Sequence, residues 1–147
     1  MVSCSSIQYI SFWNLNTYQK EGVIKGIYCS RQNHMIELPN NMIALSSPIN
    51  DYLIIIINPN NYTIEKEIQE ECFSFTCCSS LCMLNPHSFV YLYNNYFLQI
   101  SIRDYSIMYK TNELKNLDGE YLVIPIEGGK YLVTTNITNG IAIIKPY

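Results

Sequence analysis

Asp51-Tyr-Leu-Ile-Ile-Ile-Ile57 decides the fold of this chain, because two further stretches repeat its pattern. They are Asn95-Tyr-Phe-Leu-Gln-Ile-Ser101 and Asn139-Gly-Ile-Ala-Ile-Ile-Lys145. Each begins with Asp or Asn, which favour turns, and continues as an apolar run typical of a strand. Their first residues are 44 positions apart in both steps (95 − 51 and 139 − 95). The sequence therefore predicts a structural repeat of about 44 residues.

One step earlier, Ile7-Gln-Tyr-Ile-Ser-Phe-Trp13 has the same strand character. Two columns of apolar residues then share the register, namely Phe12, Ile56, Ile100 and Ile144, and Ile10, Ile54, Leu98 and Ala142. The columns are two residues apart, so each pair lies on one face of its strand.

Short strands separated by turns fill the rest of each repeat. We expect turns at 38–41, 58–61, 85–88 and 127–129, and strands over 27–38, 42–47, 62–68, 72–84, 89–93, 121–126 and 131–135. The prediction is one all-β domain over 1–147, with repeat units at approximately 1–26, 27–70, 71–114 and 115–147. Each complete unit contains four antiparallel strands.

The composition agrees with this fold class and argues against nucleic-acid binding. Charged residues are only 14%, while Ile (22), Asn (16) and Tyr (13) are abundant. Ile and Tyr favour strands, and Asn favours turns. The formal net charge is −3 and the basic residues are scattered, so no basic patch that could bind phosphates is expected.

The amino-terminal stretch MVSCSSIQYISFWNL has neither a basic region nor an apolar core of a signal peptide. The longest apolar run, Leu53 to Ile57, is far shorter than the roughly 20 residues that span a bilayer. We therefore expect a cytoplasmic protein that does not associate with membranes, with its six cysteines reduced.

A repeat of this length with four strands resembles the WD40 family of β-propellers. The family's turn and strand, of the form Asp-Gly-x-Ile-x-Leu-Trp-Asp, has degenerate counterparts in Asp51 to Asn58, in Asn139 to Pro146 and in Phe12-Trp13-Asn14. The family's Gly-His pair is absent, because Ile27 follows Gly26. The resemblance implies about three WD40-like blades in an incomplete ring.

The resemblance also implies a function, that of a non-catalytic scaffold that binds other proteins. A ring needs at least four blades, and 147 residues contain about 3.3 repeats (147/44). Self-association would complete the ring or cover open sheet edges. A fragment of a larger propeller protein with no independent function is the other alternative.

The sequence offers one chemical alternative, a metal-binding or thiol-dependent enzyme built on Cys72, Cys77, Cys78 and Cys82 with His87 nearby. Adjacent Cys77 and Cys78 on a strand face opposite ways, so packing is the preferred interpretation. His34, placed in a strand, and His87, placed in a turn, belong to no recognisable motif. We expect no catalytic, metal or cofactor-binding residue.

Three further features have a structural and a functional interpretation. They are the acidic residues Glu65, Glu67, Glu70 and Glu71, the glycosylation sequons at Asn61 and Asn136, and the aromatic residues Tyr91, Tyr93 and Tyr96. An acidic outer strand, chance sequons and strand cores are the structural interpretations. Aromatic residues that contact a protein partner are the functional alternative.

Overall fold

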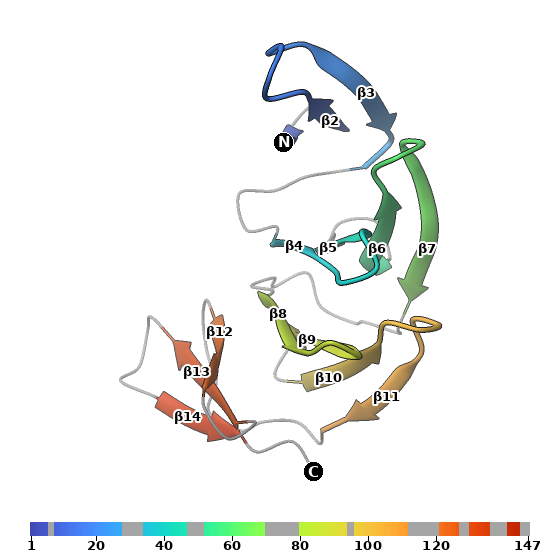
Figure 1. Cartoon of the computed structure of the whole chain (residues 1–147). Helices are drawn as coiled ribbons and strands as arrows, with labels where there is room; N and C mark the ends of the chain where they lie inside the picture. The colour runs from blue at the N-terminus through green and yellow to red at the C-terminus, as the bar shows by residue number, and fades with distance from the viewer. Residues whose placement is uncertain are drawn as a thin grey trace. The chain divides into compact units, whose positions relative to one another are not determined.

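The protein is all-β in the residues that the structure describes. The computed structural model describes residues 1–5, 8–27, 34–46, 52–69, 80–93, 96–111, 121–126, 130–135 and 141–144, with the backbone alone at 4–5, 52–53, 93 and from 121 onward. All regular secondary structure in this part of the chain is β-strand, and it contains no helix that is long and apolar enough to cross a membrane. The strands are β1 (Val2–Ser5), β2 (Tyr9–Trp13), β3 (Lys20–Lys25), β4 (Met35–Glu37), β5 (Ile43–Ser46), β6 (Tyr52–Asn58), β7 (Thr63–Gln69), β8 (Ser80–Asn85), β9 (Ser88–Tyr93), β10 (Tyr96–Ser101), β11 (Ile107–Lys110), β12 (Tyr121–Ile126), β13 (Lys130–Thr135) and β14 (Ile141–Ile144) (Figure 1).

Consecutive strands pair antiparallel and form four separate sheets. Their strand orders are β1-β2-β3, β4-β5-β6-β7, β8-β9-β10-β11 and β12-β13-β14. The expected four strands are thus present in two sheets, and the first and last sheets have three described strands each. The predicted all-β class with units of antiparallel strands is confirmed.

The period of 44 residues predicts the placement of equivalent strands in the four sheets. The column Ile10, Ile54, Leu98 and Ala142 lies on β2, β6, β10 and β14. β6 and β10 are the third strands of their sheets and lie beside the last strand. β2 likewise lies beside β3, the last strand of the first sheet. The repeat seen in the sequence is therefore a repeat of strand position.

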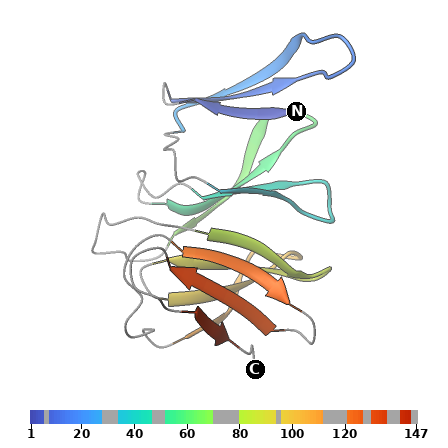
Figure 2. The same ribbon diagram turned by 90° about the vertical axis from the view of Figure 1, so that its left-hand side faces the viewer.

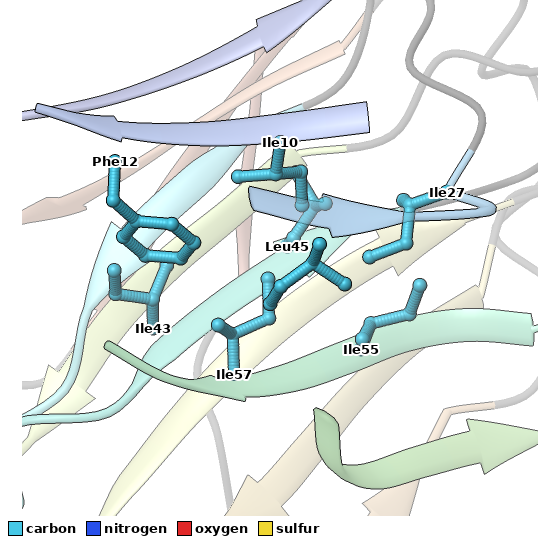
Figure 3. Packing of buried hydrophobic residues seen from close by; sticks show 8 residues of the cluster. Ile10, Phe12, Ile27, Ile43, Leu45, Ile55 and Ile57 are labelled. Atoms are coloured by element: carbon cyan, nitrogen blue, oxygen red, sulfur yellow. The ribbon is translucent and has the colours of Figure 1, made fainter. Parts of the chain in front are cut away.

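The chain divides into an N-terminal unit, Met1–Phe73, and a C-terminal unit, Ser74–Tyr147. In the N-terminal unit the sheet β1–β3 packs against the sheet β4–β7 through a buried apolar cluster (Figure 3). Ile10 and Phe12 of β2 face Ile43, Leu45, Ile55 and Ile57 of the second sheet. Ile24 and Ile27 complete the cluster, with Val2, Met35 and Tyr62 packed at its margin.

Both faces of β6 are buried. Ile55 and Ile57 face the cluster, and Ile54 and Ile56, which point the other way, are 0% exposed. This explains why β6 is a continuous run of isoleucines and shows no alternation of apolar and polar residues.

In the C-terminal unit β8 lies beside β12, so the sheets β8–β11 and β12–β14 are neighbours (Figure 2). The middle strands β9 and β10 supply most of the described core, which includes Phe89, Val90, Tyr91, Leu92, Phe97, Leu98 and Ile100. Tyr91 is fully buried, so its structural interpretation is correct.

One expected strand differs from the observed one, and another is described only in part. The first strand of the second sheet is only Met35–Glu37, and Ile27 and Leu38 are buried residues outside strands. His34, expected within a strand, precedes β4. The described part of the strand expected over 72–84 is β8, Ser80–Asn85, and residues 70–79 lie outside the described part.

Candidate interaction surface

Three short turns lie at one edge of the N-terminal unit. Ile43, which follows the turn 38–42, pairs with Ile57, which precedes the turn 58–62, so both turns are at the same end of the sheet β4–β7. The turn 14–19 joins β2 to β3. Tyr62, which belongs to the turn 58–62, lies against Phe12 and Gly22 of that hairpin. The turn 14–19 is therefore at the same edge as the other two turns (Figure 2). We call residues 14–19, 38–42 and 58–62 the turn edge.

Two asparagines, 44 residues apart, organise the turns after β2 and β6 (58 − 14). The Asn14 Oδ1 accepts hydrogen bonds from the backbone N–H groups of Asn16, at 2.8 Å, and Thr17, at 3.2 Å. The Asn58 Oδ1 accepts one from the backbone N–H of Asn60, at 3.0 Å. Each side chain closes the turn that follows it, as asparagine commonly does.

The amide nitrogens of the same two asparagines each bind a glutamate. The Asn14 Nδ2 donates to the Glu21 Oε1 at 2.8 Å, and the Asn58 Nδ2 donates to the Glu65 Oε1 at 3.0 Å. Both glutamates are skipped in the strand register, since Phe12 pairs with Gly22 and Trp13 with Lys20, while Ile56 pairs with Lys66 and Ile57 with Ile64. The β-bulge turns each glutamate toward its asparagine.

A tyrosine with left-handed backbone conformation ends each of these turns. Tyr18 has φ 56°, Tyr62 has φ 59°, and Tyr105 has φ 59° in the corresponding turn after β10. This conformation is unfavourable for a bulky residue. The Tyr62 ring packs 5.0 Å from the Phe12 ring, centroid to centroid, and this packing offsets the backbone strain.

The turn edge carries two exposed apolar side chains. Tyr18 is 83% exposed and Leu15 is 58% exposed, although both belong to a turn fixed by the Asn14 side chain. The turn 38–42 is also ordered by its own contacts, because Leu38 N–H donates to the Met42 carbonyl at 2.8 Å and Asn41 has φ 62°. The edge therefore presents aromatic and amide groups on a pre-formed backbone.

The C-terminal unit has a corresponding edge at the turns 86–87 and 102–106. Ile102 N–H donates to the His87 carbonyl at 2.9 Å, which joins the two turns. The Asp104 carboxylate accepts hydrogen bonds from the Ser106 hydroxyl, at 2.8 Å, and from its backbone N–H. Hydrogen bonds from the side chains of Ser101 and Ser106 hold the pKa of Asp104 below its usual value.

The predicted chemical candidates are only partly within the described residues. Cys72, Cys77 and Cys78 lie outside them. Cys82 is a buried free thiol, and burial raises its pKa. The described residues contain no group of three or more His, Cys, Asp or Glu side chains that could hold a metal ion. The expectation that the protein has no metal or cofactor site stays a prediction.

The two histidines are placed separately. His87 is exposed in the turn after β8, where its backbone N–H donates to the Asn85 Oδ1 at 2.8 Å. His34 is half-buried before β4, and desolvation lowers its pKa. His34 N–H donates to the Ser46 hydroxyl at 2.8 Å, and its carbonyl accepts from Ser46 N–H at 2.9 Å. Its backbone therefore continues the pairing of β4 with β5.

The remaining candidates fit structural roles where they are described. Glu65 and Glu67 are exposed on β7, and Glu70 and Glu71 lie outside the described residues. The Asn61 Oδ1 accepts from the Thr63 hydroxyl at 2.7 Å, and Asn136 lies outside. Tyr96 is half-buried beneath the Lys110 ammonium, 4.7 Å from its ring centroid, while only the backbone of Tyr93 is described.

Sequence reasoning missed the Asn–Glu pairs and the left-handed tyrosines. A signal was available, since Asn14, Glu21 and Tyr18 recur 44 residues later as Asn58, Glu65 and Tyr62. The comparison of apolar columns alone did not include these polar positions.

Comparison with solved structures identifies the fold. U3-55K is similar with a TM-score of 0.65 and 11% identity, over 98% of this chain and 47% of that one. The WD40 domain of SCAP from fission yeast has a TM-score of 0.54 and 13% identity, over 97% and 38%. A complex of the fission yeast SREBP–SCAP binding domains has a TM-score of 0.56 and 15% identity, over 97% and 44%.

These likenesses show that the fold is that of WD40-like β-propeller blades. The chain spans less than half the length of each of these structures. No family model and no curated protein sequence matches it.

Proposed function

We propose that this chain is a non-catalytic scaffold that binds a protein partner through the turn edge of its N-terminal unit. The observation that carries the proposal is Tyr18, which is 83% exposed on a turn held by the Asn14 side chain. Tyrosine is enriched at binding hot spots because it supplies a large contact area at low conformational cost. A pre-formed turn lowers the entropic cost of association further.

The similar structures support a protein-binding role at the level of the fold. One of them is a complex between the binding domains of two proteins, SREBP and SCAP. Propellers host many functions, so the choice of surface rests on the residues of this chain alone.

The thiol-enzyme alternative receives no support from Cys82. Catalytic cysteines have a lowered pKa and an accessible sulfur, whereas burial raises the pKa of the Cys82 thiol. We also propose a cytoplasmic location, which fluorescence microscopy of the tagged chain in its source cell tests directly.

Site-specific photo-crosslinking tests the surface. A photoreactive phenylalanine analogue in place of Tyr18 captures the partner, and the same analogue in place of Met108 is the matched control. Met108 is 60% exposed but lies on β11 of the C-terminal unit, outside the turn edge. The partner is then purified, and its affinity for the chain and its variants is measured by calorimetry.

We expect Tyr18→Ala to weaken binding of the purified partner about tenfold or more, and Met108→Ala to leave it unchanged. Equal capture at both positions, or a Tyr18→Ala variant with full affinity, would refute the turn edge as the binding surface.

A further inference from the structure

The outer edge of β1 differs from the corresponding edge in the two four-stranded sheets. β5 pairs with β4 on this side, and β9 pairs with β8. β1 is the last strand of its sheet, and no described strand pairs with its outer edge. β2 and β3 correspond to β6 and β7 of the second sheet, so the three described strands of the first sheet correspond to the last three strands of the second.

The hydrogen bonds of Met1 determine which backbone groups of β1 face outward. The Met1 amine donates to the Trp13 carbonyl, and Trp13 N–H donates to the Met1 carbonyl, both at 2.8 Å. In an antiparallel pair, hydrogen-bonded and non-hydrogen-bonded positions alternate. The register pairs Val2 with Phe12 and Cys4 with Ile10, so the N–H and C=O groups of Val2 and Cys4 point away from β2.

The second sheet shows what pairs with these positions when a strand is present. Val2 and Cys4 correspond to Ala44 and Ser46, because their partners Phe12 and Ile10 correspond to Ile56 and Ile54. Ala44 pairs with Ile36 of β4, and Ser46 N–H donates to the His34 carbonyl.

The third sheet repeats this arrangement with an apolar first strand. Phe89 pairs with Met83 and Tyr91 pairs with Leu81, at the positions that correspond to Val2 and Cys4. The chain's own sheets therefore define the register of a segment that fits beside β1. The third sheet gives its chemistry, an antiparallel strand with Met opposite Val2 and Leu opposite Cys4, while the second sheet has Ile36 and His34 at these places.

The β1 edge is also free of the features that normally prevent strand addition. Its sequence Val-Ser-Cys-Ser contains no lysine, proline or other residue that blocks pairing. Val2 packs at the margin of the buried cluster and is only half-buried, so an added apolar strand would extend existing apolar contacts.

We propose that β1 is a strand-addition site, at which an extended apolar segment of a partner polypeptide pairs antiparallel through the backbone of Val2 and Cys4. This mode of recognition takes its affinity from main-chain hydrogen bonds and its specificity from alternate side chains. The site does not involve the turn edge, so a negative result for the function proposed above would not contradict it, and the reverse also holds.

The probe is a peptide that copies β8, the first strand of the third sheet. The peptide acetyl-Ser-Leu-Ala-Met-Leu-Asn-amide copies β8 with Cys82→Ala, and its register places Leu opposite Cys4 and Met opposite Val2. Binding of the fluorescent peptide to the 147-residue chain is measured by anisotropy. Two N-methylated peptides separate backbone pairing from side-chain contact.

N-methylation of the first Leu and the Met removes the N–H groups directed at β1, and we expect it to weaken binding about tenfold or more. N-methylation of the Ala and the second Leu alters the opposite edge, and we expect affinity within about twofold of the parent peptide. Equal affinity of the two methylated peptides, or no binding of the parent peptide, would overturn the proposal.

Variants of the chain give an independent measurement. Val2→Pro removes an outward N–H and no hydrogen bond of the β1–β2 pair, while Val2→Ala loses the same side-chain contacts and keeps that N–H. We expect Val2→Pro to abolish peptide binding, Val2→Ala to retain most of it, and Tyr18→Ala to leave it unchanged. Urea unfolding confirms that each variant is folded.

Sedimentation distinguishes a second copy of this chain as the occupant. A dimer that Val2→Pro dissociates, and that the peptide does not, would contradict a partner segment and assign the edge to self-association. A monomer that binds one peptide per chain supports the proposal.

Discussion

Asn58 uses both ends of its side-chain amide, and this explains why it is not an aspartate. Its oxygen accepts from Asn60 N–H and its nitrogen donates to the Glu65 carboxylate. Aspartate would make the first contact and place a second negative charge beside Glu65. The same reasoning applies to Asn14 and Glu21.

We therefore predict that Asn58→Asp lowers the free energy of unfolding by about 1 kcal/mol at pH 7. The repulsion requires two ionised carboxylates, so the loss is expected at pH 7 and becomes smaller at acidic pH, where fewer carboxyl groups are charged. Urea unfolding at pH 7 and pH 4 measures the difference. The variant Asn58→Asp with Glu65→Gln is the control and recovers most of the loss at pH 7.

Asp104 provides a second pH-dependent residue. Its pKa is lowered by hydrogen bonds from Ser101 first and then Ser106, so its contribution to stability is present at neutral pH and is lost as the pH falls through the lowered pKa. We predict that Ser106→Ala raises the pKa of Asp104 toward its ordinary value. An NMR titration of the carboxyl carbon measures this change, and Thr17→Ala, which removes an exposed hydroxyl from the N-terminal unit, is the comparison. An unchanged titration in Ser106→Ala contradicts the assignment.

At the scale of the elements, one glycine sets how the first two sheets approach each other. A Cβ at Gly22 of β3 would overlap the Tyr62 ring, which belongs to the turn after β6. Tyr62 also contacts Phe12 of β2. The turn of one sheet is therefore seated on the strands of the neighbouring sheet.

This contact predicts coupling between the two residues. Gly22→Ala alone lowers the free energy of unfolding by about 1–3 kcal/mol, because the packing cannot accept the added methyl group. With Tyr62→Ala present, the same change costs little, since the ring is gone. A double-mutant cycle measures the coupling. Additive effects of the two substitutions would show that the sheets do not meet at this position.

The strands whose buried residues recur every 44 positions could be predicted from the sequence, and so could β12, but the bounds of β4 could not. The column that contains Ile54 and Leu98 revealed β6 and β10, because a buried middle strand needs apolar residues throughout. β4 has only three residues, and its pairing with β5 continues through the backbone of His34, which leaves no side-chain pattern.

The candidate surface was less predictable for a related reason. Tyr18 and Tyr62 have the same backbone conformation, yet one is 83% exposed and the other packs on Phe12. Burial of Tyr62 depends on Gly22 of a neighbouring sheet, and a single sequence does not show which sheets are neighbours. The sequence predicts turns there but not which tyrosine remains free for a partner.

At the scale of the whole molecule, the repeat makes a quantitative claim: turns at equivalent positions are interchangeable. Asn14-Leu-Asn-Thr-Tyr-Gln19 and Asn58-Pro-Asn-Asn-Tyr-Thr63 share the capping asparagine, the left-handed tyrosine and the bulged glutamate that follows. The turn after β10 is different, because a serine occupies the place of the asparagine: Ser101 Oγ accepts from Arg103 N–H at 3.2 Å, and Ser101 has no amide nitrogen to bind a glutamate.

A turn exchange tests this claim. The triple variant Pro59→Leu, Asn61→Thr and Thr63→Gln gives the second sheet the turn of the first, and we predict a change in the free energy of unfolding of less than about 1 kcal/mol, since the hydrogen bonds of Asn58 and the packing of Tyr62 remain. Replacement of residues 58–62 by Ile-Arg-Asp-Tyr, copied from 102–105 without the capping Ser101, removes the Asn58–Glu65 bond and shortens the turn by one residue. We expect that variant to lose about 2 kcal/mol or more, because the capping bonds and the seat of Tyr62 on Gly22 are lost together. Urea unfolding of both variants measures the two losses of unfolding free energy. Similar losses would mean that the length and capping of the turn do not define the repeat. A large difference would show that the turn, as well as the apolar strands, maintains the interval of 44 residues.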